Sequence, residues 1–266
     1  MDTDKELEGK VALITGSARN MGRAFSIALA RMGADVVVHH HGDASRQDAQ
    51  TTAGLVSKHG RRAIVSGGNL SEVAHVKRLF DEAQAAFGRI DIVVNNAGLV
   101  LKKPFMEVSE EDYDRSFGIN AKAAFFVMQE AARRIADQGR IINMGTTILG
   151  ATIGMFSIYA GSKAPLEDFT RALAKEIGHR GVTVNTVAPG PIDTPFYHGQ
   201  EDQTSESRAR QASVAGRLGT VEDVVPVIEF LASEKSRWVT AQTLFVNGGY
   251  LTVALVLMGA ILGAWR

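Results

Sequence analysis

Short apolar runs rich in valine and isoleucine alternate along the chain with longer stretches in which apolar residues recur at helical spacing. The short runs predict strands at residues 11–15, 36–38, 63–65, 90–94, 140–143, 182–187 and 243–246. The longer stretches predict helices at residues 21–31, 44–58, 71–87, 110–136, 157–178 and 221–232, with a break near Gly118 and a tolerated Pro165. This order is typical of βαβ units. The sequence therefore predicts an α/β fold: a single Rossmann-type, doubly wound parallel sheet of about seven strands with helices on both faces.

Two segments depart from this alternation. Residues 189–216 are polar and irregular in pattern, and an irregular stretch of that length is often a lid or a binding loop. The chain carries no charge over residues 239–265, and residues 251–265 are almost wholly apolar. This apolar run is shorter than the roughly 20 residues that a membrane-spanning helix needs. We therefore expect one dinucleotide-binding domain over residues 1–252, which includes the irregular segment as a substrate loop, and an apolar extension over residues 253–266.

Composition narrows the chemistry. The 266 residues include no cysteine, which excludes disulfides, thiolate metal sites and a cysteine nucleophile. Lysine plus arginine and aspartate plus glutamate both number 29, so no basic excess indicates a nucleic-acid partner. The N-terminus is polar and lacks the apolar core of a secretory signal, so we expect a cytoplasmic protein.

A glycine turn follows the first predicted strand. Gly16 lets the backbone bend, and Gly22 lets the next helix pack close to the strand. The N–H groups and the dipole at the start of that helix attract a pyrophosphate. A purely structural turn is the alternative, but the strand before it, the helix after it and the β-branched second strand favour a dinucleotide site.

The end of the second predicted strand indicates which dinucleotide binds. An acid at this place binds the ribose 2′-hydroxyl of NAD, whereas this chain has His39, His40 and His41 and no acid before Asp43. Arg19 in the turn supplies a cation that suits a 2′-phosphate. We therefore expect NADP(H) in preference to NAD(H). The three histidines do not predict a metal site, because neighbouring strand residues point to opposite faces, and no metal is expected.

Tyr159 and Lys163 stand one helical turn apart at the start of a predicted helix. This spacing puts both side chains on one helical face. An ammonium group there would lower the pKa of a phenol from its ordinary value of about 10. For the pair alone, a surface aromatic residue beside a cation is the alternative.

Four motifs occur in an order that is typical of one family. They are the turn from Thr15 to Gly22, the run from Asn95 to Gly98, the Tyr159–Lys163 pair and Pro189-Gly190. On these motifs the chain resembles the short-chain dehydrogenase/reductase family from about residue 10 to residue 251, and in pattern it is most similar to 3-oxoacyl-[acyl-carrier-protein] reductases. The resemblance implies an oxidoreductase that transfers a hydride between the nicotinamide and a carbonyl or secondary alcohol substrate.

The resemblance also implies a catalytic tetrad. Asn120, Tyr159 and Lys163 match the family's asparagine, tyrosine and lysine. Tyr159 is then the general acid or base, Lys163 holds the nicotinamide ribose and lowers the tyrosine pKa, and Asn120 holds a water in the proton relay. The family serine falls on Thr146, whose hydroxyl can bond a substrate carbonyl and whose methyl narrows the pocket. Thr147 is adjacent and is the alternative.

Cofactor contacts carry over in the same way. The expected contacts are Gly16, Ser17, Arg19, Asn20, Met21, Gly22, His40, His41, Asn69, Leu70, Asn95, Ala97, Gly98, Tyr159, Lys163, Pro189, Gly190, Ile192 and Thr194. Asn20 stands where the family has a glycine, and asparagine tolerates the left-handed geometry. Asn69 replaces the adenine-binding aspartate, and its amide oxygen can still accept from the adenine amino group.

An apolar pocket is expected around the substrate, which suits a ketone of moderate size. Its expected walls are Thr147, Ile148, Met155, Phe156, Pro191, Phe196 and Tyr197. The resemblance implies a homotetramer, or a dimer, assembled through the predicted helices at 110–136 and 157–178. The extension at 253–266 is expected to dock on a neighbouring subunit, with membrane contact or no binding role as alternatives. A catalytically silent NADP(H)-binding sensor or scaffold is the competing function, and the intact set of Asn120, Tyr159 and Lys163 argues against it.

Overall fold

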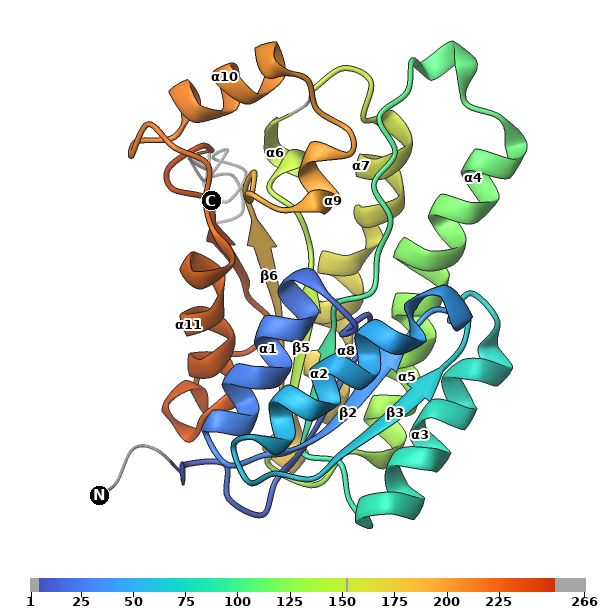
Figure 1. Cartoon of the computed structure of the whole chain (residues 1–266), viewed down its shortest axis with the longest axis vertical. Helices are drawn as coiled ribbons and strands as arrows, with labels where there is room; N and C mark the ends of the chain where they lie inside the picture. The colour runs from blue at the N-terminus through green and yellow to red at the C-terminus, as the bar shows by residue number, and fades with distance from the viewer. Residues whose placement is uncertain (1–4, 152, 252–266) are drawn as a thin grey trace, which may run out of the picture.

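One sheet of seven parallel strands organises the computed structural model, which describes residues 5–151 and 153–251. The strand order is β3-β2-β1-β4-β5-β6-β7, and Figure 1 labels four of these strands, β2, β3, β5 and β6. Their bounds are β1 Val11–Ile14, β2 Asp35–His40, β3 Ala63–Gly67, β4 Ile92–Asn95, β5 Arg140–Met144, β6 Thr183–Pro189 and β7 Thr243–Val246. The predicted doubly wound sheet is confirmed. The order reverses between β1 and β4, which places a crevice at the carboxyl ends of those strands.

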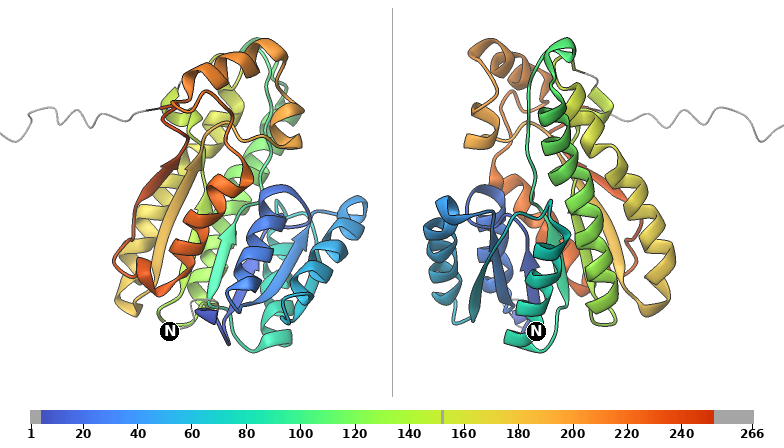
Figure 2. Two further views of the ribbon diagram at one scale, coloured as in Figure 1. Left: turned by 60° about the vertical axis from the view of Figure 1, so that its left-hand side comes forward. Right: turned by 90° about the vertical axis from the view of Figure 1, so that its right-hand side faces the viewer.

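A layer of helices covers each face of the sheet (Figures 1 and 2). The helices on one face are α1 (Asn20–Arg31), α2 (Arg46–Ser57) and α11 (Val221–Ala232), and those on the other are α3 (Val73–Phe87), α5 (Ala124–Arg134) and α8 (Pro165–Ile177). Successive strand residues point to opposite faces of the sheet: Ile14 packs in the buried cluster that contains Phe25, and Leu13 packs in the one that contains Phe80. Strands buried on both faces explain the continuous apolar runs in the sequence.

The long helix predicted at 110–136 is built from three pieces. α4 (Glu110–Phe117) and α5 flank a π-helical segment at Gly118–Ala123. Ser109 begins α4 as the N-cap of a capping box. Irregular π-helical turns of this kind occur frequently at functional sites, and this one carries Asn120.

The helix predicted at 157–178 is α7 (Ser157–Lys163) followed by α8. Ala164 keeps helical backbone angles between them, with φ −54° and ψ −40°. Pro165 takes the first position of α8, where no backbone N–H donor is needed. α7 packs beside α4 and α8 packs beside α5, as the right-hand view of Figure 2 shows.

Residues 189–216 contain helices that the sequence pattern does not predict. Thr194 is the N-cap of α9 (Pro195–His198), and Asp202 is the N-cap of α10 (Gln203–Ala212), where it forms a capping box. The prediction of an irregular segment is wrong here, because α10 is polar on nearly every side and buries one residue, so it shows no apolar stripe. Both helices lie at the end of the molecule where β6 terminates (Figure 1).

The described residues also bear on membranes and metals. Within residues 5–151 and 153–251, no helix is long and apolar enough to cross a bilayer. The same part of the chain contains no group of three or more histidine or acidic side chains that could hold a metal ion. The extension expected at 253–266 lies outside the described residues.

Candidate active site

The turn between β1 and α1 has the shape that a pyrophosphate site needs. Asn20 adopts φ 52°, in the left-handed region that asparagine tolerates. A Cβ on Gly22 would stand 2.4 Å from the Gly16 carbonyl oxygen and 2.7 Å from Ser17 Cα, so glycine alone permits this approach of helix to turn. A Cβ on Gly16 would stand 3.0 Å from Ala97 Cα. The first N–H groups of α1 lack acceptors within the helix, which favours an anion there.

His39 ties this turn to β2, a role that sequence reasoning missed. Its Nδ1 accepts from the Gly16 N–H at 3.1 Å, and its Nε2 lies 2.9 Å from the Gly68 carbonyl oxygen. Its backbone N–H donates to Ser17 Oγ at 2.9 Å, and its carbonyl accepts from the Ser17 N–H at 2.9 Å. The run of three histidines is the signal in the sequence, and the register of β2 decides that His39 faces the turn.

The other groups expected near a 2′-phosphate differ in exposure. Arg19 and His41 are exposed. His40 is buried: its ring stands 2.5 Å from the place of a Cβ on Gly67, and its Nδ1 lies 2.9 Å from the Gly42 carbonyl oxygen. Arg19 and His41 are therefore better placed than His40 to meet an anion.

Asn69 and Leu70, expected to contact adenine, are engaged by the protein. Asn69 Oδ1 accepts from the Ser71 N–H at 3.1 Å and from the Ser71 hydroxyl at 2.8 Å, which forms a turn before α3. Leu70 is buried among the apolar residues under α3. The expected adenine acceptor is thus already occupied, because an amide oxygen has two lone pairs and both have donors.

Asn95 also points into the protein. It is buried, and its Nδ2 donates to Asn143 Oδ1 at 3.1 Å and to the Ala124 carbonyl oxygen at 3.0 Å. Its side chain therefore stabilises the junction of β4, β5 and α5 instead of lining the crevice. Ala97 follows β4 with its N–H donating to Thr15 Oγ1 at 2.9 Å, which holds the expected adenosine wall against the glycine turn.

Three of the predicted residues meet just after β4. A Cβ on Gly98 would stand 3.1 Å from Asn120 Oδ1 and 3.2 Å from Lys163 Nζ. Asn120 is fully buried; its Oδ1 accepts from the Leu99 N–H at 2.9 Å, and its Nδ2 donates to Ser162 Oγ at 2.9 Å. The π-helical segment thereby joins the loop after β4 to α7.

Tyr159 and Lys163 are both buried on α7. Lys163 Nζ donates to the Met144 carbonyl oxygen at 2.8 Å, and burial lowers the pKa of Lys163 to about 8. Burial raises the pKa of Tyr159, and the Thr146 hydroxyl stands close enough to act in the opposite direction. The expected lowering of the Tyr159 pKa by Lys163 does not appear, because burial dominates and the ammonium is bonded to the end of β5.

The hydroxyls of Thr146 and Thr147 have different partners. Thr147 Oγ1 donates to the Ala188 carbonyl oxygen at 3.0 Å, and the Thr147 N–H donates to the Pro189 carbonyl oxygen at 3.0 Å. Thr147 therefore joins β5 to β6, while Thr146 faces Tyr159. This arrangement favours Thr146 as the counterpart of the family serine and removes Thr147 from the expected substrate wall.

The chain is similar to known proteins over nearly its whole length. Residues 16–251 match the family model described as enoyl-(acyl carrier protein) reductase. A hydroxynaphthalene reductase-like protein from Metarhizium brunneum is 38% identical over 264 residues, which cover 94% of this chain and 98% of the relative. The chain belongs to the short-chain dehydrogenase/reductase family. The resemblance inferred from the sequence is confirmed, and the protein is an oxidoreductase of that family.

Solved structures of other short-chain dehydrogenases/reductases superpose closely on this one. A dehydrogenase from Burkholderia cenocepacia with bound NADP is 42% identical, with a TM-score of 0.90, and the match covers 95% of this chain and 97% of that one. The angucycline C-6 ketoreductase LanV with bound NADP is 34% identical, with a TM-score of 0.87, and the match covers 93% of this chain and 97% of that one.

The motif at the end of β6 starts the substrate loop of this short-chain dehydrogenase/reductase. A Cβ on Gly190 would stand 2.9 Å from Asn247 Cα, so glycine allows the segment after β7 to approach. Ile192 forms a parallel bridge with Gly219, and Thr194 is buried at the start of α9. These contacts hold the main chain of the loop where it leaves the sheet.

The remaining expected substrate walls lie on α6, before α7 and on α9. They are Ile148 at the start of α6 (Ile148–Ala151), Met155, Phe156, Phe196 and Tyr197. Phe156 is buried, with its ring centroid 6.3 Å from that of Tyr159, whereas Met155 and Phe196 are 45% and 39% exposed. Met155 also adopts φ 69°, a left-handed conformation that is uncommon for a side chain of this size. Phe156 therefore packs against Tyr159, and the other two present apolar surface to solvent.

An ion pair joins the substrate loop to the loop after β4. Lys102 Nζ pairs with the Glu201 carboxylate, and these side chains are only 16% and 10% exposed. The Lys102 N–H donates to Gln200 Oε1 at 2.9 Å, and the ammonium lies 5.6 Å from the centroid of Phe156. Burial, together with Glu201, raises the pKa of the neighbouring Tyr197 to about 12. The loop is thus bound across the expected substrate entrance.

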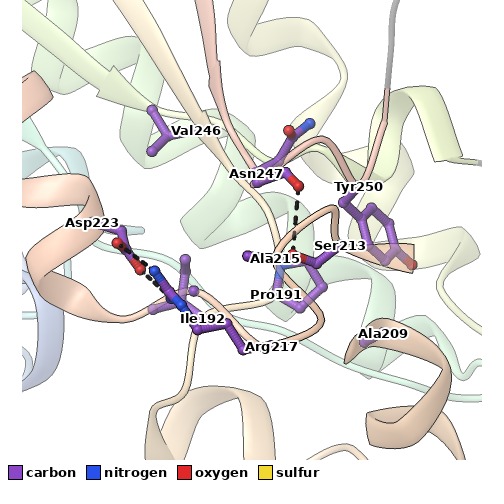
Figure 3. A pocket seen from close by; sticks show the side chains of 12 residues that line it. Pro191, Ile192, Ala209, Ser213, Ala215, Arg217, Asp223, Val246, Asn247 and Tyr250 are labelled. Atoms are coloured by element: carbon purple, nitrogen blue, oxygen red, sulfur yellow. Dashed lines mark hydrogen bonds and ion pairs between the residues drawn. The ribbon is translucent and has the colours of Figure 1, made fainter. Parts of the chain in front are cut away.

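A cavity of about 180 Å³ lies at the other end of the substrate loop (Figure 3). Its lining includes Pro191, Ile192, Ala209, Ser213, Ala215, Arg217, Gly219, Asp223, Val246, Asn247, Gly248 and Tyr250. Arg217 pairs with Asp223 at 2.6 Å, so the charge of its guanidinium is neutralised by the protein. Tyr159 and Lys163 do not line this cavity. Of the expected substrate walls it contains Pro191 alone, so it is separate from Tyr159 and Lys163.

Proposed function

We propose that this protein transfers a hydride between NADP(H) and the carbonyl of an apolar ketone or the corresponding secondary alcohol. The observation that carries the proposal is the convergence of Thr146, Tyr159, Lys163 and Asn120 after β4 and β5. All four side chains are buried, and titratable groups with perturbed pKa values beside a dinucleotide-type turn are typical of a catalytic site.

The glycine turn supports NADP(H) as the cofactor. Gly22 and Asn20 give the turn a shape that brings the start of α1 to a pyrophosphate. Arg19 in the turn is exposed, and His41 is exposed after β2, where an acid would favour NAD; both suit a 2′-phosphate. The Burkholderia dehydrogenase and LanV were solved with NADP, which supports the same choice. When bound, NADP(H) supplies or accepts the hydride.

The chain's own residues handle the proton. A phenol has an ordinary pKa of about 10, and burial raises that of Tyr159, so at neutral pH its hydroxyl carries a proton that it can donate to a carbonyl oxygen and recover from an alcohol in the reverse direction. The Thr146 hydroxyl donates a second hydrogen bond to the same oxygen. Lys163 binds the nicotinamide ribose beside Gly98, and Asn120 fixes the loop around them and holds the water of the proton relay.

The substrate proposed for this site is a largely apolar ketone. Phe156 packs against Tyr159, Met155 and Phe196 expose apolar surface, and the charges of Lys102 and Glu201 neutralise each other. Two of the reported relatives are described as a hydroxynaphthalene reductase-like protein and an angucycline C-6 ketoreductase. Polycyclic aromatic ketones are therefore the first compounds to test.

Assembly and location belong to the same proposal. Tyr113 of α4 and Phe125 of α5 are 49% and 41% exposed, and such apolar surface on paired helices supports a homotetramer, or a dimer, built through them. We propose one domain over residues 1–252, with a small-molecule substrate and a cytoplasmic location. Light scattering of the purified protein measures the subunit number.

Replacing Tyr159 with phenylalanine tests the proposed chemistry. Tyr159→Phe removes only the phenolic oxygen, so NADPH binding should stay within about twofold while kcat falls about a thousandfold or more. NADPH fluorescence measures binding, and NADPH absorbance over a ketone panel measures turnover. Normal turnover by Tyr159→Phe contradicts the proton-transfer role. A wild-type protein that binds NADPH and reduces no ketone favours the silent sensor.

A further inference from the structure

His39 makes four hydrogen bonds that connect the ends of three strands. Two involve the ring, which lies between the Gly16 N–H and the Gly68 carbonyl oxygen at 3.1 and 2.9 Å. Two involve its main chain, which exchanges hydrogen bonds with Ser17 at 2.9 Å each. The ring is 2% exposed, so no bulk water competes for these partners.

These partners determine the protonation state of the ring. The Gly16 N–H can only donate, so Nδ1 must carry a lone pair. The Gly68 carbonyl can only accept, so Nε2 must carry the proton. The required species is the neutral Nε2–H tautomer. Burial lowers the pKa of His39 to about 4, and the neighbouring His40, His41 and Arg78 act in the same direction, so the neutral ring persists at physiological pH.

We propose that His39 is a positioning residue for the cofactor: its Nδ1 holds the Gly16 N–H and thereby fixes the glycine turn in the shape that receives the pyrophosphate. The Gly16 and Ser17 N–H groups are both directed at His39. The anion is thus left to the N–H groups that begin α1. A turn without the Nδ1 acceptor has an unpaired N–H, which a small backbone rotation can redirect. The inference rests on the proposed NADP(H) site.

Three substitutions at position 39 separate the two ring contacts. His39→Asn places a carboxamide oxygen near the position of Nδ1 and keeps the acceptor for Gly16. His39→Gln places an amide N–H near the position of Nε2 and keeps the donor for Gly68. His39→Leu keeps neither. His59→Leu, which removes an exposed histidine at the end of α2, is the matched control.

The Kd for NADPH should follow the Gly16 acceptor. We expect His39→Asn to bind NADPH within about threefold of the wild type, and His39→Gln and His39→Leu to bind about tenfold more weakly, the scale of one lost hydrogen bond. The KM for NADPH should rise in parallel while kcat at saturating NADPH stays within about twofold, because the ring does not touch the reacting atoms. Nitrogen NMR of the wild type should show an unprotonated Nδ1 and a protonated Nε2 at position 39.

Two results overturn the inference and leave the proposed function standing. One is equal weakening of NADPH binding by all three variants in proportion to their loss of thermal stability, which indicates a purely structural histidine. The other is a proton on Nδ1 in the NMR spectrum. A wild-type protein that binds no NADPH in the same assay overturns the proposed function itself.

Discussion

The turn after β1, the proposed cofactor side of the site, and the substrate loop after β6, its proposed substrate side, are built in different ways. In the turn, the Gly16 and Ser17 N–H groups both bond His39, a residue from another strand, and Gly22 packs against backbone atoms. In the substrate loop, α10 begins with its own capping box, and the loop is tied to neighbouring segments by the Lys102–Glu201 pair, by the Lys102 N–H on Gln200 Oε1 and by the Val214 N–H on the Gly248 carbonyl oxygen.

This difference in construction predicts how easily the turn and the substrate loop can each move. Buried hydrogen bonds between neighbouring strands break only when the sheet itself is disturbed. We expect a polar helix with one buried residue, held by an ion pair and a few loop hydrogen bonds, to detach more readily while the sheet stays folded. We therefore expect the proposed cofactor side to be preorganised before a ligand arrives, and the proposed substrate side to open and close more readily.

The largest expected effect comes from adding one methyl to the turn. In Gly22→Ala the new Cβ meets the Gly16 carbonyl oxygen at 2.4 Å and Ser17 Cα at 2.7 Å, and neither backbone atom can yield without moving β1 or α1. We expect the free energy of unfolding to fall by about 3 kcal/mol, at the upper end for overpacking, and NADPH binding to be lost. Urea denaturation and NADPH fluorescence measure the two effects.

Gly54→Ala is the matched control. Gly54 lies within α2, and a Cβ there has no atom within 4 Å. Since alanine is about 1 kcal/mol better than glycine in a helix interior, this variant should be slightly more stable and bind NADPH normally. If Gly22→Ala behaves like Gly54→Ala, the turn is less rigid than the comparison requires.

Lowering the pH should reduce the free energy of unfolding, because it protonates His39 on the cofactor side. Its pKa is about 4 in the folded protein and 6.5 in its ordinary state, so the unfolded chain binds the proton more tightly. The stability contributed by the neutral ring is complete above pH 6.5 and is lost as the pH falls to about 4. The loss approaches about 3 kcal/mol relative to His39→Asn, which lacks the titrating group. The free energies of unfolding of the two proteins, measured by denaturation at several pH values from 7 to 4, should therefore diverge. A difference that stays constant over this range contradicts a buried neutral ring.

Arg19 lies at the exposed edge of the turn, where its substitution tests which dinucleotide the turn prefers. Arg19→Ala should weaken NADPH binding about tenfold or more and leave NADH binding nearly unchanged, because only NADPH carries the 2′-phosphate that a guanidinium can bind. NADH serves as the internal control in the same titration. Equal weakening of both dinucleotides means that Arg19 does not read the 2′-phosphate.

Periodicity in the sequence predicted the parts of the fold that bury an apolar face. α11 and β7 lie at the residues where their apolar patterns predicted them. The same criterion fails for α10, because a polar helix at the surface has no apolar stripe to detect. Its N-terminus is marked by a capping box at Asp202, and this local signal is hard to recognise in a segment with no regular pattern.

The candidate site was predictable in its motifs but not in the directions of its side chains. Tyr159 and Lys163 follow from helical spacing, which fixes a shared face. Asn95 turns toward the protein because its amide bonds Asn143 and Ala124, which come from distant segments. Asn69 is held by Ser71, two residues further along the chain, in a local turn that the motif alone does not reveal. His39 is selected over the two following histidines by strand register, which one chain segment does not reveal.

The smallest expected effect tests the substrate side. Lys102→Met leaves the Glu201 carboxylate nearly buried without its partner, so the loop should favour an open state. We expect the KM for the ketone to rise about three- to tenfold, while the Kd for NADPH stays within about twofold because the turn does not contact this pair. Steady-state kinetics with a ketone substrate, together with NADPH fluorescence, separates the two quantities.

Lys103→Met is the neighbouring control, because Lys103 pairs with Asp112 of α4 and not with the substrate loop. It should leave the KM for the ketone unchanged. The double variant Lys102→Met/Glu201→Gln should recover part of the lost affinity, since it removes the unpaired carboxylate along with the lysine. A change in NADPH affinity as large as the change in KM would show that the two sides of the site are mechanically coupled. Their difference in construction would then not translate into independent motion.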